Sequence, residues 1–147
     1  MMVLRGCAPE KSIRELVEAS DAAGFDALFL SPFAASKLSL VEVRFAFYLA
    51  NKAFGGRKNI SGKRANEALL FLACETNFAS AAKKIGASDS SDFVLVAERN
   101  VPLSKLKRAL GLGKAKRMKL PEWGKKEGSY FSGERGAERM ALERIRN

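Results

Sequence analysis

The sequence predicts an α/β fold, of the α+β kind, in which a mixed β-sheet of about four strands is flanked by helices within a single domain. Short apolar runs of strand length alternate along the chain with segments of helical periodicity. Two of the helical segments begin with a Ser and a Glu at the spacing of a capping box. The chain has 147 residues, 47% of them hydrophobic, which is the length and apolar content of one domain with a core.

The amino-terminal half is predicted to contain two strands and two helices. In chain order these are a strand that begins at Val3, a helix over 13–23, a strand over 25–30 and a helix over 40–54. Ser12 and Glu15 have the capping-box spacing at the first helix, and Ser39 and Glu42 repeat it at the second. The second helix is apolar on most of its circumference, so we expect its aromatic residues to pack in the core.

The carboxyl-terminal half continues the alternation. Its predicted elements are a strand over 68–74, a helix over 78–85, a strand over 92–97 and a helix over 103–110. The run 68–74 (ALLFLAC) is continuously apolar, which favours a strand covered on both faces. Residues 112–136 are rich in glycine and lysine and are predicted to form a long, positively charged connection without regular structure. A C-terminal helix with a narrow apolar edge is expected after it.

Composition and charge exclude several classes of function. The chain has 26 Lys and Arg against 16 Asp and Glu, a net charge of +10, which favours binding to polyanions. It has no histidine, so Ser-His and Cys-His nucleophile pairs and histidine metal sites are excluded. Cys7 and Cys74 form no Cys-x-x-Cys motif, and we expect no metal or cofactor. Neither a signal peptide nor a membrane span is evident, which predicts a cytoplasmic protein without a membrane partner.

Two basic clusters are candidates for contact with nucleic acid. They consist of Arg57, Lys58, Lys63 and Arg64 in one segment and of Lys83 and Lys84 in another. Lys and Arg beside glycine-containing backbone bind phosphates with a strong salt dependence, and six such contacts would give a slope of roughly −5 in log affinity against log salt. A solvated surface with no partner is the alternative. The segment 57–64 lacks the G-x-x-x-x-G-K-[ST] pattern of nucleotide hydrolases.

Several segments resemble the TPRKB family, whose members are the small non-catalytic subunits of the KEOPS complex. The resemblance spans roughly residues 30–98 and is carried by Arg57-Lys58-Asn59-Ile60, Leu69–Ala73, Asn77–Gly86 and Val94–Val96, with a further likeness at Glu138–Glu143. The archaeal members place a Gly-Thr-Arg-Gln-type turn after the segment that corresponds to 69–73. This chain has Cys74-Glu75-Thr76-Asn77 there, so an arginine contact to RNA at that turn is missing.

The resemblance implies a subunit without catalytic residues. The KEOPS complex makes N6-threonylcarbamoyladenosine in tRNA, and this subunit binds and stimulates the complex's small atypical kinase and helps to hold tRNA, including its 3′ CCA end. By this analogy, the kinase would dock on the apolar edge of the predicted C-terminal helix, which is formed by Met140, Leu142 and Ile145. The six cations at 57, 58, 63, 64, 83 and 84 would contact tRNA.

Two other functions stay open at this point. One is a small cytoplasmic enzyme that acts on a phosphorylated metabolite with a carboxylate base, for which Glu67 and Glu75 are the candidate residues. The other is an interaction protein whose charge serves only solubility. The sequence leaves the strand order and the oligomeric state undetermined.

Overall fold

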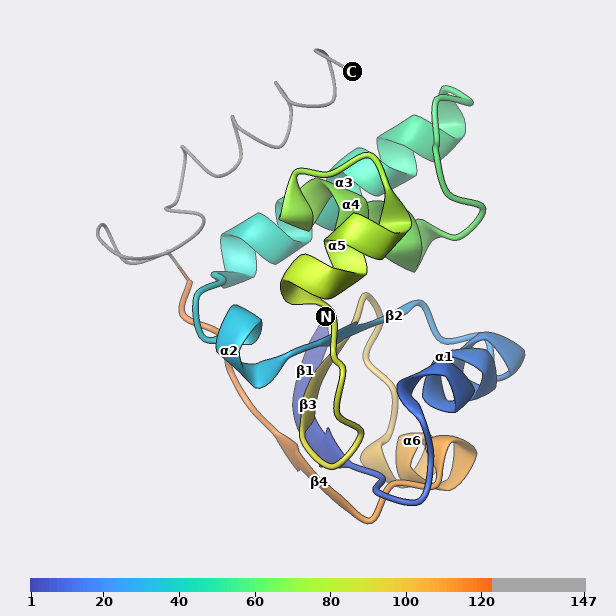
Figure 1. Cartoon of the computed structure of the whole chain (residues 1–147), viewed down its shortest axis with the longest axis vertical. Coiled ribbons are helices and arrows are strands. Elements are labelled where there is room, and N and C mark those ends of the chain that lie inside the picture. The colour runs from blue at the N-terminus through green and yellow to red at the C-terminus, as the bar shows by residue number, and fades with distance from the viewer. Residues whose placement is uncertain (123–147) are drawn as a thin grey trace. The chain divides into compact units, whose positions relative to one another are not determined.

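A computed structural model describes residues 1–122 of the chain, and their contacts divide into two compact units (Figure 1). Unit 1 comprises Met1–Pro32 and Gly86–Lys119, and unit 2 comprises Phe33–Ile85 with the segment from Leu120. The α/β class and the number of strands are confirmed, although one of the four strands lies elsewhere in the chain than predicted. Within the described residues, unit 1 contains the sheet and unit 2 contains helices, and the single domain expected over residues 1–147 stays a prediction.

Unit 1 contains a four-stranded sheet and two helices. Its elements are β1 (Met2–Cys7), α1 (Ile13–Ala22), β2 (Ala27–Leu30), β3 (Phe93–Ala97), α6 (Leu103–Leu110) and β4 (Lys114–Arg117). The strand order is β2-β3-β1-β4 and every pairing is antiparallel, although the sequence predicted a mixed sheet. The helices α1 and α6 lie on one face of the sheet (Figure 1). The core on that face includes Leu4, Leu16, Phe93, Leu106 and Leu110.

Unit 2 is a stack of helices. They are α2 (Pro32–Ala35), which begins at the boundary between the units, α3 (Leu40–Gly55), α4 (Arg64–Ala73) and α5 (Phe78–Ile85). The central helix α4 packs against both α3 and α5. The backbone N–H groups of Leu40 and Val41 donate to the carbonyls of Pro121 and Glu122, so the chain returns to the first turn of α3. Among the described residues, no helix combines the length and the apolar character needed to cross a membrane.

Both predicted capping boxes are present. The hydroxyl of Ser12 accepts from the backbone N–H of Glu15, and that of Ser39 accepts from the N–H of Glu42. In each box the glutamate carboxylate accepts from the backbone N–H of the serine. Because these contacts satisfy N–H groups that a helix leaves open, the two serines fix where α1 and α3 begin.

The strand predicted over 68–74 is wrong, because these residues belong to the helix α4. The segment from Arg64 to Ala73 has no β-branched residue and is rich in Ala and Leu, which are strong helix formers. Eight of its ten residues are buried, so the continuous apolar run reflects a helix surrounded by neighbours. It ends at Cys74, whose φ of 55° is left-handed, and the N–H of Glu75 donates to the carbonyl of Leu70.

The fourth strand lies instead at Lys114–Arg117, within the segment 112–136 that was predicted to be a loop. The strand β4 pairs with β1, and the N–H of Met118 extends the pairing by donating to the carbonyl of Val3. The remainder of the predicted loop beyond residue 122 and the predicted C-terminal helix lie outside the described residues.

Candidate nucleic-acid interface

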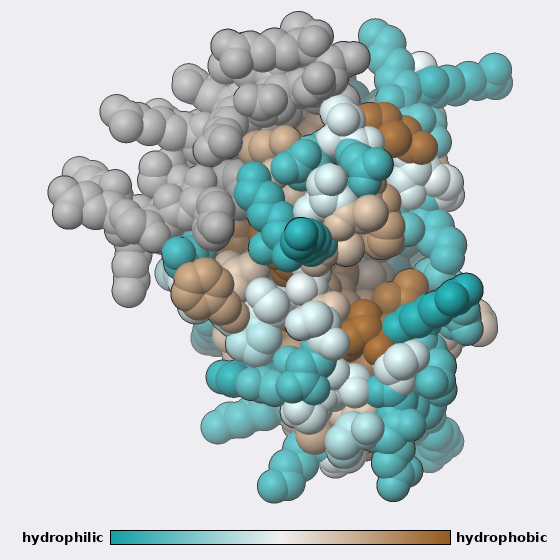
Figure 2. Space-filling view, viewed as in Figure 1, coloured by the Kyte–Doolittle hydropathy of each residue, from teal (hydrophilic) through white to brown (hydrophobic). Residues whose placement is uncertain are grey.

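The connection between α3 and α4 presents four cations to solvent. All four side chains, those of Arg57, Lys58, Lys63 and Arg64, are exposed, which contact with RNA would require. Within residues 1–122, no carboxylate lies within ion-pair distance of Arg57, Lys58 or Arg64. Figure 2 shows long hydrophilic side chains projecting from the end of unit 2 where this connection lies. We refer to residues 57–64 as the basic loop.

A buried carboxylate holds the basic loop in shape. Glu67, in the first turns of α4, is 0% exposed, and its carboxylate accepts from the backbone N–H of Ser61 at 2.8 Å and from that of Ile60 at 3.1 Å. These contacts compensate the carboxylate for its loss of water and fix the middle of the loop against the helix. The position of Glu67 near the positive end of α4 further favours its charge.

Backbone hydrogen bonds fix the first end of the basic loop, and a side-chain contact lies at the second. Arg57 has a left-handed φ of 55°, and its N–H donates to the carbonyl of Phe54. The N–H of Lys58 donates to the carbonyl of Ala53 at 2.8 Å, which closes the last turn of α3. At the other end the guanidinium of Arg64 lies 6.0 Å from the centre of the Phe54 ring, within cation–π range. The cations are therefore carried by a loop of defined conformation.

Lys83 and Lys84 do not join the basic loop. Both lie in the last turn of α5, and the ammonium of Lys84 donates to the carbonyl of Ala73 at 2.8 Å. Ala73 is the last residue of α4, whereas the basic loop ends at its first residue, Arg64. Ten helical residues span about 15 Å, so the two clusters lie at opposite ends of one helix. Lys83 is exposed, and Lys84 is half-buried and stabilises the end of α4.

The two carboxylates considered for acid–base catalysis do not form a pair. Glu67 binds the basic loop, and Glu75 follows the C-terminal cap of α4, so residues 68–74 and most of the helix separate them. Glu67 is also fully buried, with its carboxylate taken up by the backbone of the loop. Among residues 1–122, no group of three side chains of metal-binding type is present either.

The aromatic residues of α3 divide between core and surface. Phe47 is buried, as expected, whereas Tyr48 is 56% exposed and lies beside Phe45 with the ring centres 6.0 Å apart. The Nζ atom of Lys52 lies 6.0 Å from the centre of the Tyr48 ring. The expectation that these aromatic residues all pack in the core is therefore wrong for Tyr48.

The proposed docking residues Met140, Leu142 and Ile145 lie outside the described residues.

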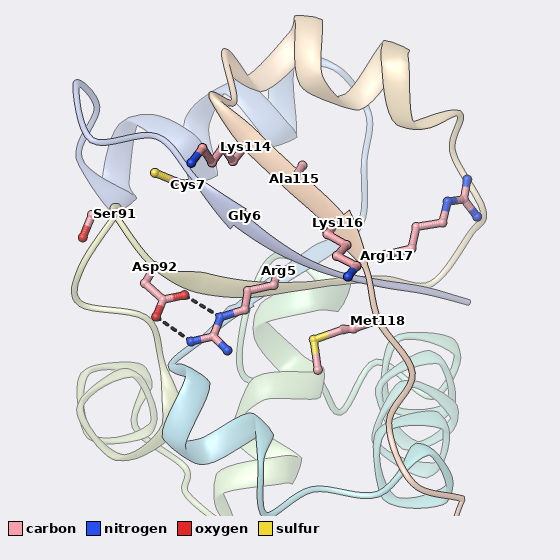
Figure 3. A pocket seen from close by; sticks show the side chains of 10 residues that line it. All are labelled: Arg5, Gly6, Cys7, Ser91, Asp92, Lys114, Ala115, Lys116, Arg117 and Met118. Atoms are coloured by element: carbon pink, nitrogen blue, oxygen red, sulfur yellow. Dashed lines mark hydrogen bonds and ion pairs between the residues drawn. The ribbon is translucent and has the colours of Figure 1, made fainter.

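Unit 1 has a second basic site that sequence reasoning missed. A cavity of about 450 Å³ is lined by residues of β1, β4 and the turn before β3, among them Arg5, Asp92, Lys114 and Lys116 (Figure 3). Both oxygens of the Asp92 carboxylate accept from the guanidinium of Arg5, at 2.7 Å each. This pairing lowers the pKa of Asp92 and raises that of Arg5. The alternation of Lys114 and Lys116 was the available signal, because residues two apart on a strand share a face.

No protein-family model matches the chain, and no curated protein matches it.

Proposed function

We propose that this chain is a non-catalytic, tRNA-binding accessory subunit of a KEOPS-type complex, which makes N6-threonylcarbamoyladenosine in tRNA. The observation that carries the proposal is the basic loop, in which four exposed cations are held on a backbone fixed by Glu67. A fixed cationic loop suits the recognition of a structured polyanion, because the phosphates of folded tRNA are themselves held at set positions.

The division of roles follows from the placement of the cations. The phosphate contacts fall to Arg57, Lys58, Lys63 and Arg64, while Lys84 serves the end of α4. Four contacts in place of six reduce the expected slope of log affinity against log salt to roughly −3. Binding of the tRNA 3′ CCA end and regulation of the small atypical kinase remain parts of the proposal that the family resemblance supports.

The first experiment measures tRNA binding of the full chain as a function of salt. Reversing the charge of Arg57, Lys58, Lys63 and Arg64 to Glu should abolish most of the affinity and flatten the salt dependence. A matched variant reverses Lys105 and Arg108 on α6 together with the exposed residues Arg14 and Lys119, which changes the net charge by the same amount away from the loop. Equal losses in the two variants would contradict the proposal and favour a charge that serves only solubility.

A second experiment addresses the complex. Co-purification with the small KEOPS kinase should give a stoichiometric pair, and Met140→Glu or Ile145→Glu should weaken it if the C-terminal edge docks the kinase. Comparing intact tRNA with tRNA that lacks CCA tests recognition of the 3′ end. Turnover of a phosphorylated metabolite by the isolated chain would instead favour the enzyme alternative.

A further inference from the structure

The pairing of β1 with β4 places several cations on one face of the sheet. Lys116 lies opposite Arg5 and Lys114 lies opposite Cys7 in the antiparallel register. Residues directly opposite in such a ladder project from the same face. Leu4 and Gly6 alternate with Arg5 along β1, and Leu4 belongs to the core beneath α1 and α6. The cations therefore project from the other face, and Figure 3 shows Arg5 and Asp92 meeting on the side away from these helices.

This arrangement leaves an excess of positive charge at the cavity. Like charges directly opposite each other on neighbouring strands are unfavourable, and Arg5 and Lys116 are such a pair. On this face the lining contains three cations, Arg5, Lys114 and Lys116, and one acid, Asp92, whereas Arg117 lies opposite Leu4 and its guanidinium donates to the carbonyl of Val101. Asp92 pairs with Arg5, and within residues 1–122 no carboxylate lies within ion-pair distance of Lys114 or Lys116. An anion in the cavity would relieve this repulsion.

The bidentate contact at Arg5 indicates the kind of anion. A guanidinium that accommodates two carboxylate oxygens at 2.7 Å presents two parallel donors, and the same fork matches two oxygens of a phosphate. Asp92 thus occupies the donors that a phosphate would use and acts as an internal competitor. Lys114 and Lys116 supply point charges beside this fork on the same face.

The size and remaining lining of the cavity suit a small molecule. A volume of about 450 Å³ lies within the usual range of small-ligand sites. Apolar surface comes from Cys7 at one end and Met118 at the other, and a hydroxyl from Ser91. We propose that this cavity binds a phosphorylated small molecule of nucleotide size, with its phosphates on Lys114, Lys116 and Arg5 and its organic part against Met118. This site lies in unit 1 and does not depend on the basic loop.

Calorimetric titration of the full chain with inorganic pyrophosphate, ADP and adenosine tests the proposal. We expect pyrophosphate and ADP to bind at one site, ADP more tightly, and adenosine to bind far more weakly. The variant K114A/K116A should weaken ADP binding about tenfold or more, because two charge-assisted contacts are lost. The matched variant K105A/R108A removes two exposed cations from α6 and should leave ADP affinity unchanged.

Asp92→Asn gives a prediction of opposite sign. It removes the internal competitor and frees the guanidinium of Arg5, so ADP binding should tighten severalfold, with circular dichroism to check that the variant folds. Absence of pyrophosphate and ADP binding at millimolar concentration and low salt would overturn the proposal. Equal weakening in K105A/R108A would also overturn it, as would binding of an RNA oligonucleotide that K114A/K116A abolishes while ADP does not bind.

Discussion

The carboxylate of Glu67 accepts the backbone N–H of Ser61 at 2.8 Å, and this contact joins a buried acid to the middle of an exposed basic loop. It has two consequences that can be separated. The acid stabilises the fold by satisfying backbone donors, and it fixes the spacing of the cations on either side of Ser61.

Removing this acid should affect both stability and tRNA binding. Glu67→Ala leaves the N–H groups of Ile60 and Ser61 without their acceptor, so we expect the free energy of unfolding to fall by about 2 kcal/mol. It also removes one carboxylate and so raises the net charge of the chain by one, which by charge alone would tighten tRNA binding. We expect weaker binding instead, because the loop loses its fixed shape.

Denaturant unfolding and tRNA titration of the same variants measure these two effects. Glu67→Gln is the matched control, because it makes the same change in charge but keeps an acceptor oxygen for Ser61. It should lose less affinity than Glu67→Ala. Tighter tRNA binding by Glu67→Ala would show that the loop contributes only charge.

The fold class was predictable from the sequence, but the role of the segment 64–73 was not. The alternation of apolar runs and the capping boxes at Ser12 and Ser39 gave correct boundaries for α1 and α3. A fully apolar run has no periodicity, so the run 68–74 could not distinguish a buried strand from a buried helix. The absence of β-branched residues in α4 was the signal that favoured the helix.

The sites depended on tertiary contacts that local sequence does not contain. The pairing of β4 with β1 brings Lys116 opposite Arg5 across more than a hundred residues, and Asp92 reaches the same guanidinium from the turn before β3. The burial of Glu67 was also unpredictable, since an isolated glutamate beside a basic segment is usually exposed. In contrast, the exposure of the loop cations followed directly from their density.

Burial of Glu42 predicts an unusual dependence of stability on pH. Its side chain is 0% exposed, and one carboxylate oxygen has no hydrogen-bond partner among residues 1–122. Burial raises its pKa from 4.5 to about 7, against the opposing effect of its bonds to Ser39. The folded state therefore binds a proton more tightly than the unfolded state. Stability should fall as pH rises from about 4.5 to about 7 and level off above that, by roughly 3 kcal/mol in total.

This dependence can be isolated because the chain has no histidine, so few other side chains titrate between about pH 5 and 8. Glu42→Gln keeps a side chain suited to a capping box but does not titrate, and it should remove the decline. Glu15→Gln changes the equivalent but exposed residue of α1 and should retain it. Urea unfolding across this range decides the matter, and the same slope in all three proteins would show that Glu42 has an ordinary pKa.

Lys83 and Lys84 provide a matched pair for the end of α4. Lys84→Ala removes the donor to the carbonyl of Ala73 and should lower the free energy of unfolding by about 1 kcal/mol. Lys83→Ala removes an exposed ammonium from the same turn and should change stability by less than about 0.5 kcal/mol. Thermal and urea unfolding measure both, and an equal effect of the two substitutions would contradict a capping role for Lys84.

Close packing beneath β1 predicts a strong effect at Gly6. A Cβ atom at this position would lie 3.0 Å from the Cε2 and Cζ atoms of Phe93, whose ring is fully buried and cannot move aside without disturbing the core. We therefore expect Gly6→Ala to lower the free energy of unfolding by about 1–3 kcal/mol.

Gly62 is the control, because a Cβ atom there meets nothing within 4 Å and its φ is not left-handed. Gly62→Ala should be neutral or slightly stabilising by restricting the unfolded chain. Urea unfolding of the two variants compares them directly, and a neutral Gly6→Ala would mean that Phe93 does not pack against β1 in this way.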